Sequence, residues 1–276
     1  YEIDGLEDRH EKTVDTPWGA PSDALVHGRI GDVNLVFIPR HGRGHRLSPS
    51  EVPYRANIAA LKMAGVTDVL AISACGSLQE QYAPGDFLAA DQFIDRTFQR
   101  SKTFFDQECV AHVSVADPVC HRLGDMCRRV MCDLGLTYHD KGTYITMEGP
   151  QFSTRAESIL YKEVWNCDVI GMTNMPEAKL AREAEICYAS IAMVTDFDCW
   201  HRDHENVEVT DIITTLTANA ASAKSLIKSL CAFADKSREV CSNGCDQALE
   251  YAIITDRTRI SKDEHRRLQH IAGRVF

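Results

Sequence analysis

Short apolar runs of β-prone residues alternate with helical segments along this chain, and that alternation limits the fold more than any other feature. The runs at residues 33–38, 67–73, 87–94, 143–147, 168–171 and 188–195 are typical of strands. Helices are predicted to begin near Pro53, Pro118, Thr154 and Pro176 and to cover residues 211–235. Strands alternating with helices predict an α/β sheet. We expect one domain over residues 1–240, with residues 241–276 as a helical C-terminal extension of it.

Composition excludes several classes of protein. The 276 residues are 44% hydrophobic and 25% charged, which is ordinary for a globular protein. The formal charge of −10 and the lack of a long basic run argue against nucleic-acid or membrane partners. No apolar run reaches about 18 residues, so no transmembrane helix is expected.

The cysteines indicate a reducing environment. Eleven cysteines are scattered through apolar context, where a free thiol acts as a small hydrophobe, so we expect a cytoplasmic protein. Cys241 and Cys245 have metal-ligand spacing, but no second pair matches them in the sequence. We therefore expect no metal site, and a local disulfide or redox clip stays open.

Two carboxylates directly follow the apolar run that ends at residue 195. Asp196 and Asp198 would point to the same side if the strand continued through them. Ligands of open α/β sheets bind beyond the carboxyl ends of strands. Carboxylates this close can have their pKa values driven apart, so that one stays protonated and donates a hydrogen bond. The alternative is an acidic turn.

Other strand ends offer complementary groups. The glycine-broken loop that contains Arg40 and His41 is suited to an anion, although a solvated basic turn would look the same. Residues 73–76 offer a hydroxyl and an open backbone. Phe152 and Met172 could face a planar ring or a sugar, although each alone is more typical of a core. The chain lacks the G-x-S-x-G, G-x-G-x-x-G and Walker motifs.

Six motifs carry a family resemblance. They are TPWGAPS at 16–22, RHGRGH at 40–45, ACGSL at 74–78, EGPQF at 148–152, GMTNMPE at 171–177 and TDFDCW at 195–200. In this order they resemble the trimeric purine nucleoside phosphorylase family, and within it the members that act on S-methyl-5′-thioadenosine, over about residues 12 to 230. The resemblance implies a nucleoside phosphorylase-like mixed β-sheet flanked by helices and a homotrimer. It implies a pentosyltransferase of purine and methionine salvage that converts methylthioadenosine and phosphate into adenine and 5-methylthioribose 1-phosphate. No cofactor is implied, since phosphate is a co-substrate.

The resemblance also assigns roles to individual residues. The phosphate positions are Arg40, His41, Ser73, Ala74 and Thr173. The purine carboxylates are Asp196 and Asp198, expected to be the catalytic pair. The other substrate positions are Cys75, Gly76, Phe152 beside the base, Ser153, Met172 on the ribose, Val209 and Ile212 around the methylthio group, and His112, which reaches a neighbouring subunit's site.

Specificity follows from the same positions. Family members that take 6-oxopurines have Glu where this chain has Ser153, and an Asp pair suits a 6-amino group better than a carbonyl. Val209 and Ile212 favour a thioether over a hydroxyl, though only modestly. We assign N7 donation to Asp196 and acceptance from the 6-amino group to Asp198, while the proton's place within the pair stays open.

Two alternatives remain. One is a broader purine nucleoside or methylthioinosine phosphorylase, and the other is a non-catalytic nucleoside-binding protein. The second arises because the family begins with a strand and a G-[ST]-G phosphate loop ahead of the position of Tyr1. We expect that segment to lie outside the sequence.

Overall fold

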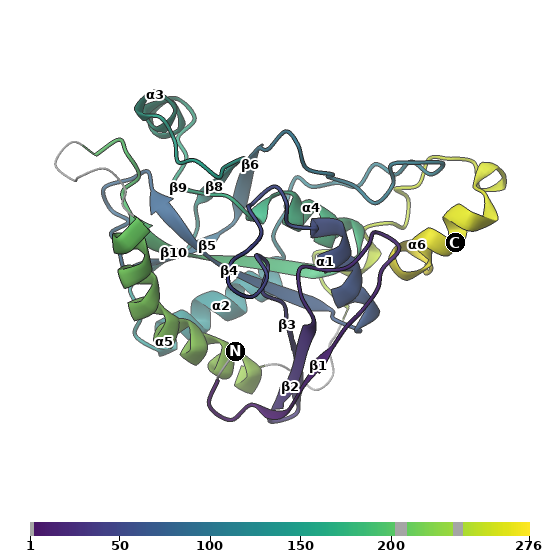
Figure 1. Ribbon diagram of the computed structural model, residues 1–276, viewed down its shortest axis with the longest axis horizontal. Helices are drawn as coiled ribbons and strands as arrows, with labels where there is room; N and C mark the ends of the chain where they lie inside the picture. The colour runs from purple at the N-terminus through teal and green to yellow at the C-terminus, as the bar shows by residue number, and fades with distance from the viewer. Residues whose placement is uncertain (1–2, 202–208, 234–239) are drawn as a thin grey trace.

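The computed structural model describes residues 3–201, 209–233 and 240–276, except for the side chains of residues 209–212. Within this part the chain forms a seven-stranded sheet with the order β6-β8-β9-β4-β10-β5-β7 (Figure 1). The strands are β4 (Asp68–Ser77), β5 (Phe87–Ala90), β6 (Gln92–Arg96), β7 (Tyr138–His139), β8 (Thr143–Met147), β9 (Val169–Gly171) and β10 (Cys187–Asp196). The sheet is mixed, as predicted, because β10 runs parallel to β4 and antiparallel to β5.

Helices cover both faces of this sheet. They are α1 (Tyr54–Met63), α2 (His121–Asp133), α3 (Arg155–Ile159), which continues as a π-helix (Leu160–Val164), α4 (Asn174–Glu183), α5 (Val209–Phe233) and α6 (Lys262–Ala272). Short 3₁₀ turns lie at Cys245–Gln247 and Arg257–Arg259. In Figure 1, α2 and α5 lie on one side of β4 and β10, and α1, α4 and α6 lie on the other.

Strand β10 is the centre of the core. Its side chains alternate between the two layers, as strand geometry requires. Tyr188 packs with residues of α1, α4 and α6. Ala189 and Ile191 pack with residues of α2 and α5. Because both faces are covered, a continuous apolar run suits this strand.

The predicted strand at 87–94 is two strands. Asp91 separates β5 from β6, which pair at distant places in the strand order. The backbone N–H of Asp91 donates to the Gly142 carbonyl at 3.2 Å, and its carboxylate accepts from the Gly142 N–H at 3.1 Å. Since a single residue joins β5 near one edge to β6 at the other, the sheet must curl until its edges approach.

Of two other predicted boundaries, the end of β4 differs from the prediction and the start of regular helix in α4 agrees with it. The strand predicted to end at Ser73 continues to Ser77, because Gly76 and Ser77 pair with β9. Helix α4 is assigned from Asn174, but Met175 is not helical, so regular helix begins at Pro176 as predicted.

The two ends of the chain form smaller layers. Strands β1 (Glu7–Lys12), β2 (Leu25–Ile30) and β3 (Val33–Phe37) make an antiparallel three-stranded sheet. At the other end, Leu268 and Ile271 of α6 are buried in the same cluster as Ile58 of α1. This shared core supports the prediction that the C-terminal segment extends the same domain. The boundary at residue 240 stays a prediction. No helix in the described residues is long and apolar enough to cross a membrane.

Candidate active site

The two aspartates lie together at the end of β10, although the strand does not carry both. It ends at Asp196, and Asp198 adopts a left-handed backbone with φ of 48°. Asp is one of the few residues that tolerates this conformation. The backbone N–H of Asp198 donates to Oδ1 of Asp196 at 2.8 Å. The pair is thus held by a turn rather than by strand alternation.

Gly76 of β4 makes room for the pair. A Cβ at this position would lie 2.9 Å from Oδ1 of Asp196 and 3.3 Å from Cβ of Asp198. Asp196 is also the strand partner of Gly76, after an irregularity in the register at Val194. The two carboxylates therefore lie against bare backbone, because Gly76 has no side chain to hold them away.

Burial keeps this pair protonated at higher pH than usual. Asp198 is only 5% exposed, and burial, aided by the nearby charge of Asp196, raises its pKa to about 6. Burial also raises the pKa of Asp196. Hydroxyl donors oppose these shifts, because Ser158 donates to Oδ2 of Asp198 and Thr195 donates to Oδ2 of Asp196. A pair that shares protons near neutral pH can both donate and accept.

Arg40 is fixed by a buried ion pair that the sequence did not reveal. Its Nε and Nη2 contact the two carboxylate oxygens of Glu177 at 2.6 and 2.9 Å. Tyr188 also donates to this carboxylate at 3.0 Å. Although burial acts in the opposite direction, Glu177 raises the pKa of Arg40. These contacts leave Nη1 of Arg40 for another acceptor.

His41 is oriented by the loop that follows it. Its Nδ1 lies 2.9 Å from the Leu47 carbonyl, so Nδ1 carries the proton and Nε2 is left to accept. Its ring stacks on His45 at 4.1 Å between centroids. Burial lowers the pKa of His41, which favours the neutral ring.

Ser73 on β4 and Thr173 just before α4 are the two predicted phosphate residues that carry hydroxyls. Both are buried, and Thr173 precedes the first residue of α4. The hydroxyl of Ser73 lies 3.3 Å from Oδ1 of Asn174, whose amide donates to Ser190 on β10. The same strand segment includes Ala74, which is partly exposed. Asn174 thus links Ser73 of β4 to the segment that begins α4.

Arg100 ties together the segments around Met172. Its Nη1 donates to the Met172 carbonyl at 2.6 Å and to the Met175 carbonyl at 2.7 Å. Its Nη2 donates to the Glu148 carbonyl at 2.7 Å. A Cβ on Gly149 would lie 2.6 Å from the sulfur of Met172, so the glycine lets the 148–152 turn pack on this side chain. Arg100 and Gly149 therefore set the position of Met172.

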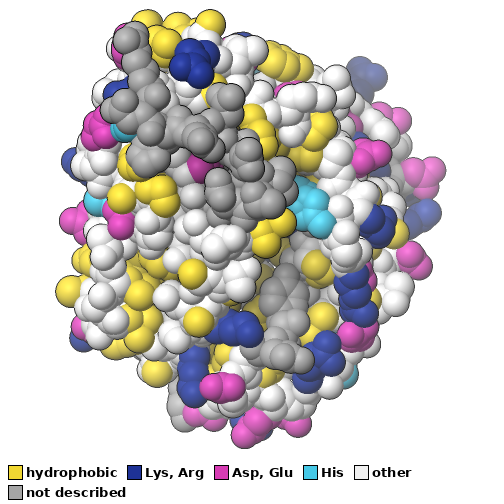
Figure 2. Space-filling model, turned by 60° about the vertical axis from the view of Figure 1, so that its left-hand side comes forward, with side chains coloured by type: hydrophobic (Ala, Val, Ile, Leu, Met, Phe, Trp, Pro, Cys, Tyr) yellow, Lys and Arg dark blue, Asp and Glu magenta, His cyan; other side chains and the backbone are white. Residues whose placement is uncertain are grey.

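The remaining predicted residues are spread more widely. Phe152 is 43% exposed. Figure 2, which brings the left-hand side of Figure 1 forward, shows apolar side chains scattered over the surface there. Ser153 follows it and accepts from the Cys199 thiol through its carbonyl at 3.2 Å. The side chain of Cys75 points into the core, where its thiol donates to the Met193 carbonyl at 3.5 Å.

His112, Val209 and Ile212 are the last of the predicted substrate residues. His112 is exposed, and its backbone N–H donates to the Ala252 carbonyl of the C-terminal extension at 2.8 Å. Val209 and Ile212 lie in the first turn of α5, but their side chains are outside the described residues.

A cavity of about 930 Å³ extends away from Arg40 and His41. Strand β3 and the first half of β4 line it, together with parts of α1, α2 and α5. Asp196 lies instead against Gly76, near the end of β4. Arg40 and His41 thus line the cavity beside the first half of β4, whereas Ser73 and Ala74, the other phosphate residues predicted on this strand, lie between that half and Gly76.

Sequence reasoning missed Glu177, Arg100 and Ser158. Glu177 is the last residue of the motif at 171–177, and nothing in the local sequence marks it as the partner of Arg40. Arg100 lies in a loop without periodicity. Ser158 lies one turn into α3, which begins with a capping box between Thr154 and Glu157. Their partners are 40 to 137 residues away, too far for any local pattern to show.

The fold and this site define the class of the protein. The family model of the phosphorylase superfamily matches residues 2–232, and the chain belongs to this family. An S-methyl-5′-thioadenosine phosphorylase of Cereibacter sphaeroides is 57% identical over 276 residues, which cover 100% of this chain and 95% of the relative. One of Rhodospirillum rubrum is 53% identical, covering 100% of this chain and 94% of the relative.

Solved structures show the same fold. A methylthioadenosine phosphorylase from an Antarctic soil metagenomic library superimposes with a TM-score of 0.91 at 45% identity, covering 98% of this chain and 94% of that one. A methylthioadenosine phosphorylase from Schistosoma mansoni, solved with adenine, has a TM-score of 0.86 at 36% identity and covers 91% of this chain and 95% of that one. The nucleoside phosphorylase-like fold predicted from the sequence is confirmed.

Proposed function

We propose that this chain is a pentosyltransferase that cleaves S-methyl-5′-thioadenosine with phosphate, giving adenine and 5-methylthioribose 1-phosphate. The observation that carries the proposal is the buried Asp196–Asp198 pair, set against Gly76 in a chain that is 57% identical to an enzyme of this name. This activity belongs to purine and methionine salvage.

The reaction needs charge stabilisation at two ends. The bond between the anomeric carbon and N9 of the purine breaks, and its electron pair goes to the purine. A phosphate oxygen forms the new bond to the same carbon. Phosphate stabilises the positive charge that develops on the ribose, and a proton donated to N7 neutralises the purine. The atoms balance with no further co-reactant.

The aspartates fit the purine end of this scheme. Asp196 in its protonated form donates to N7, and Asp198 accepts from the 6-amino group. Raised pKa values in both carboxyls support the presence of a donor in the pair near neutral pH. Because the two groups are coupled, the proton belongs to the pair and not to one member.

The other assignments extend the proposal. Phosphate is bound by Arg40 through Nη1 and by the segments 73–74 and 173, and the P–OH group of the phosphate donates to Nε2 of His41. Since Glu177 already neutralises Arg40, hydroxyl and backbone donors must supply much of the phosphate binding. Met172 faces the ribose and Phe152 faces the base, beside Ser153 and the backbone of Cys75 and Gly76.

Assembly and location are parts of the same proposal. The enzyme is a homotrimer in which His112 reaches a neighbour's site, and Val209 and Ile212 surround the methylthio group. Its location is the cytoplasm. The burial of cysteines such as Cys127 and Cys167 as core side chains supports a reducing compartment.

The test is adenine release from methylthioadenosine with and without phosphate. Wild-type protein should release adenine only with phosphate, whereas a nucleoside-binding protein would release none. Asp196→Asn should lower kcat by about 10²- to 10⁴-fold, the usual contribution of a positioned proton donor. Asp263→Asn is the matched control, because this carboxylate is 88% exposed on α6. Turnover of Asp196→Asn near that of wild type would rule out the assigned role.

Substrate choice is tested separately. The kcat/KM for methylthioadenosine should exceed that for methylthioinosine and for inosine. Equal values for the three would identify a broader nucleoside phosphorylase instead.

A further inference from the structure

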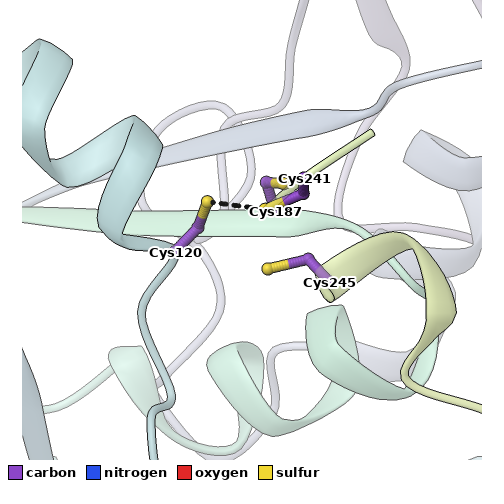
Figure 3. Close-up of side chains that lie close together, drawn as sticks. All are labelled: Cys120, Cys187, Cys241 and Cys245. Atoms are coloured by element: carbon purple, nitrogen blue, oxygen red, sulfur yellow. Dashed lines mark hydrogen bonds between the residues drawn. The ribbon is translucent and has the colours of Figure 1, made fainter. Parts of the chain in front are cut away.

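Four buried cysteines from three separate segments meet beside the core layer of α2 and α5. Cys120 precedes α2, Cys187 begins β10, and Cys241 and Cys245 lie in the C-terminal extension. Figure 3 shows their side chains pointing toward one another. The second pair that the sequence lacked beside Cys241 and Cys245 is therefore supplied by residues far away in the chain.

The spacing of the sulfurs suits a tetrahedral metal ion. All four lie within 4.8 Å of one another, and Cys120 and Cys241 are 3.5 Å apart. A zinc ion with Zn–S bonds of about 2.3 Å places its sulfurs about 3.8 Å apart. No disulfide joins any of the eleven cysteines in the described part of the chain.

The backbone at three of the four corners is held by a hydrogen bond. The N–H of Cys120 donates to the Tyr188 carbonyl at 2.8 Å. The N–H of Cys187 donates to the Thr67 carbonyl at 3.0 Å. The N–H of Cys241 donates to the Asp246 carboxylate at 2.7 Å. The cluster is thus a built arrangement and not a chance meeting of mobile side chains.

Positive charge lies beside the sulfurs. Nη1 of Arg182 donates to the sulfur of Cys245 at 3.2 Å. Cys120 is the N-cap residue of α2, at the positive end of the helix dipole. A cation and a helix N-terminus would therefore compensate negative charge on a set of thiolates.

We propose that Cys120, Cys187, Cys241 and Cys245 form a structural tetrathiolate zinc site. On binding, four S–H bonds break, four Zn–S bonds form and four protons pass to solvent, which leaves a site of formal charge −2. Four protein ligands fill the coordination of the ion, so it has no open position for substrate. The site fastens the C-terminal extension to β10 and α2, and it does not rest on the proposed function.

The first experiment uses the full chain, purified without chelators or added metal. Elemental analysis should find about one zinc per chain, and a mercurial reagent that blocks thiols should release it to a chromogenic chelator. X-ray absorption at the zinc edge should show sulfur ligands only, at about 2.3 Å. Zinc at trace level in this preparation, and none bound after reconstitution under reducing conditions, would overturn the proposal.

The second experiment uses a variant and a matched control. The double variant Cys241→Ser/Cys245→Ser should lose the zinc, whereas Cys127→Ser should keep it, because Cys127 is equally buried in the same core layer. If the double variant fails to fold, cobalt substitution in the wild type decides. Thiolate-to-cobalt charge-transfer bands with tetrahedral visible bands support the site. Their absence, or a disulfide within the cluster found by mass spectrometry of the unreduced protein, refutes it.

Discussion

Replacing Gly76 by alanine tests whether the exact seating of the aspartate pair matters for activity. The new methyl group would lie 2.9 Å from Oδ1 of Asp196, 3.2 Å from Cγ2 of Ile170 and 3.3 Å from Cβ of Asp198. Ordinary contacts of a Cβ are longer, so these groups must move by about 0.5 Å. Oδ1 ends the Asp196 side chain, but this carboxylate cannot turn away freely because Thr195 and the Asp198 N–H hold it.

The magnitude follows from that displacement. A misplacement of 1 Å at a reacting centre costs about 10²-fold, so 0.5 Å should lower kcat/KM by about 10-fold or more. Overpacking should also lower the free energy of unfolding by about 1–3 kcal/mol. Adenine release under phosphate saturation measures the first effect, and urea unfolding measures the second.

Gly124→Ala is the control for a glycine change without a clash. Its Cβ would meet only the Arg128 side chain, at 3.4 Å, inside helix α2. Alanine is favoured over glycine in a helix by about 1 kcal/mol, so stability should rise slightly and activity should not change. If Gly76→Ala keeps kcat/KM within two-fold of wild type, the pair does not act at the reacting centre as proposed.

Three further changes probe charge and capping. Burial raises the pKa of Asp198 to about 6, so the stability that its protonated form contributes is complete below pH 3.8 and is lost as the pH rises through 6. Asp198→Asn cannot ionise, so its melting temperature should exceed that of wild type at pH 7.5 but not at pH 4, and equal gaps at both pH values would contradict this. Glu177→Gln leaves the charge of Arg40 buried without its partner, so urea unfolding should show a free energy of unfolding lower by about 3–5 kcal/mol. The KM for phosphate should rise as well. An unchanged KM would mean that Arg40 does not belong to the phosphate site. Ser261→Ala removes the hydroxyl that accepts from the Glu264 N–H at 3.2 Å. The free energy of unfolding, measured with urea, should fall by about 1 kcal/mol, and the rate of adenine release should not change.

The order of elements could be predicted because each carries its own local signal. Apolar runs identified β8 and β10, and prolines identified the starts of α1 and α4. The break at Asp91 could not be predicted, because its cause is a pairing with Gly142, which is distant in the sequence. The continuation of β4 to Ser77 likewise depends on pairing with β9.

The candidate site also has parts that the local sequence shows and parts that depend on the folded structure. The Asp196–Asp198 motif and the Arg40 loop were visible as residue types at strand ends. The turn that brings the two carboxylates together was not, since the left-handed conformation of Asp198 has no local signature in this sequence. Nor was the ion pair with Glu177, whose carboxylate is 137 residues from Arg40.

The pairing of β4 with β10 also bears on how the chain reaches its native state. Asp68 pairs with Cys187, so the two central strands join segments made at very different times during synthesis. Closing so long a loop carries an entropy cost before the paired strands stabilise anything. Folding rates fall as such distant contacts come to dominate. We therefore expect refolding to be slow compared with a helical bundle, and the nascent chain to expose the apolar face of β4 until β10 has emerged.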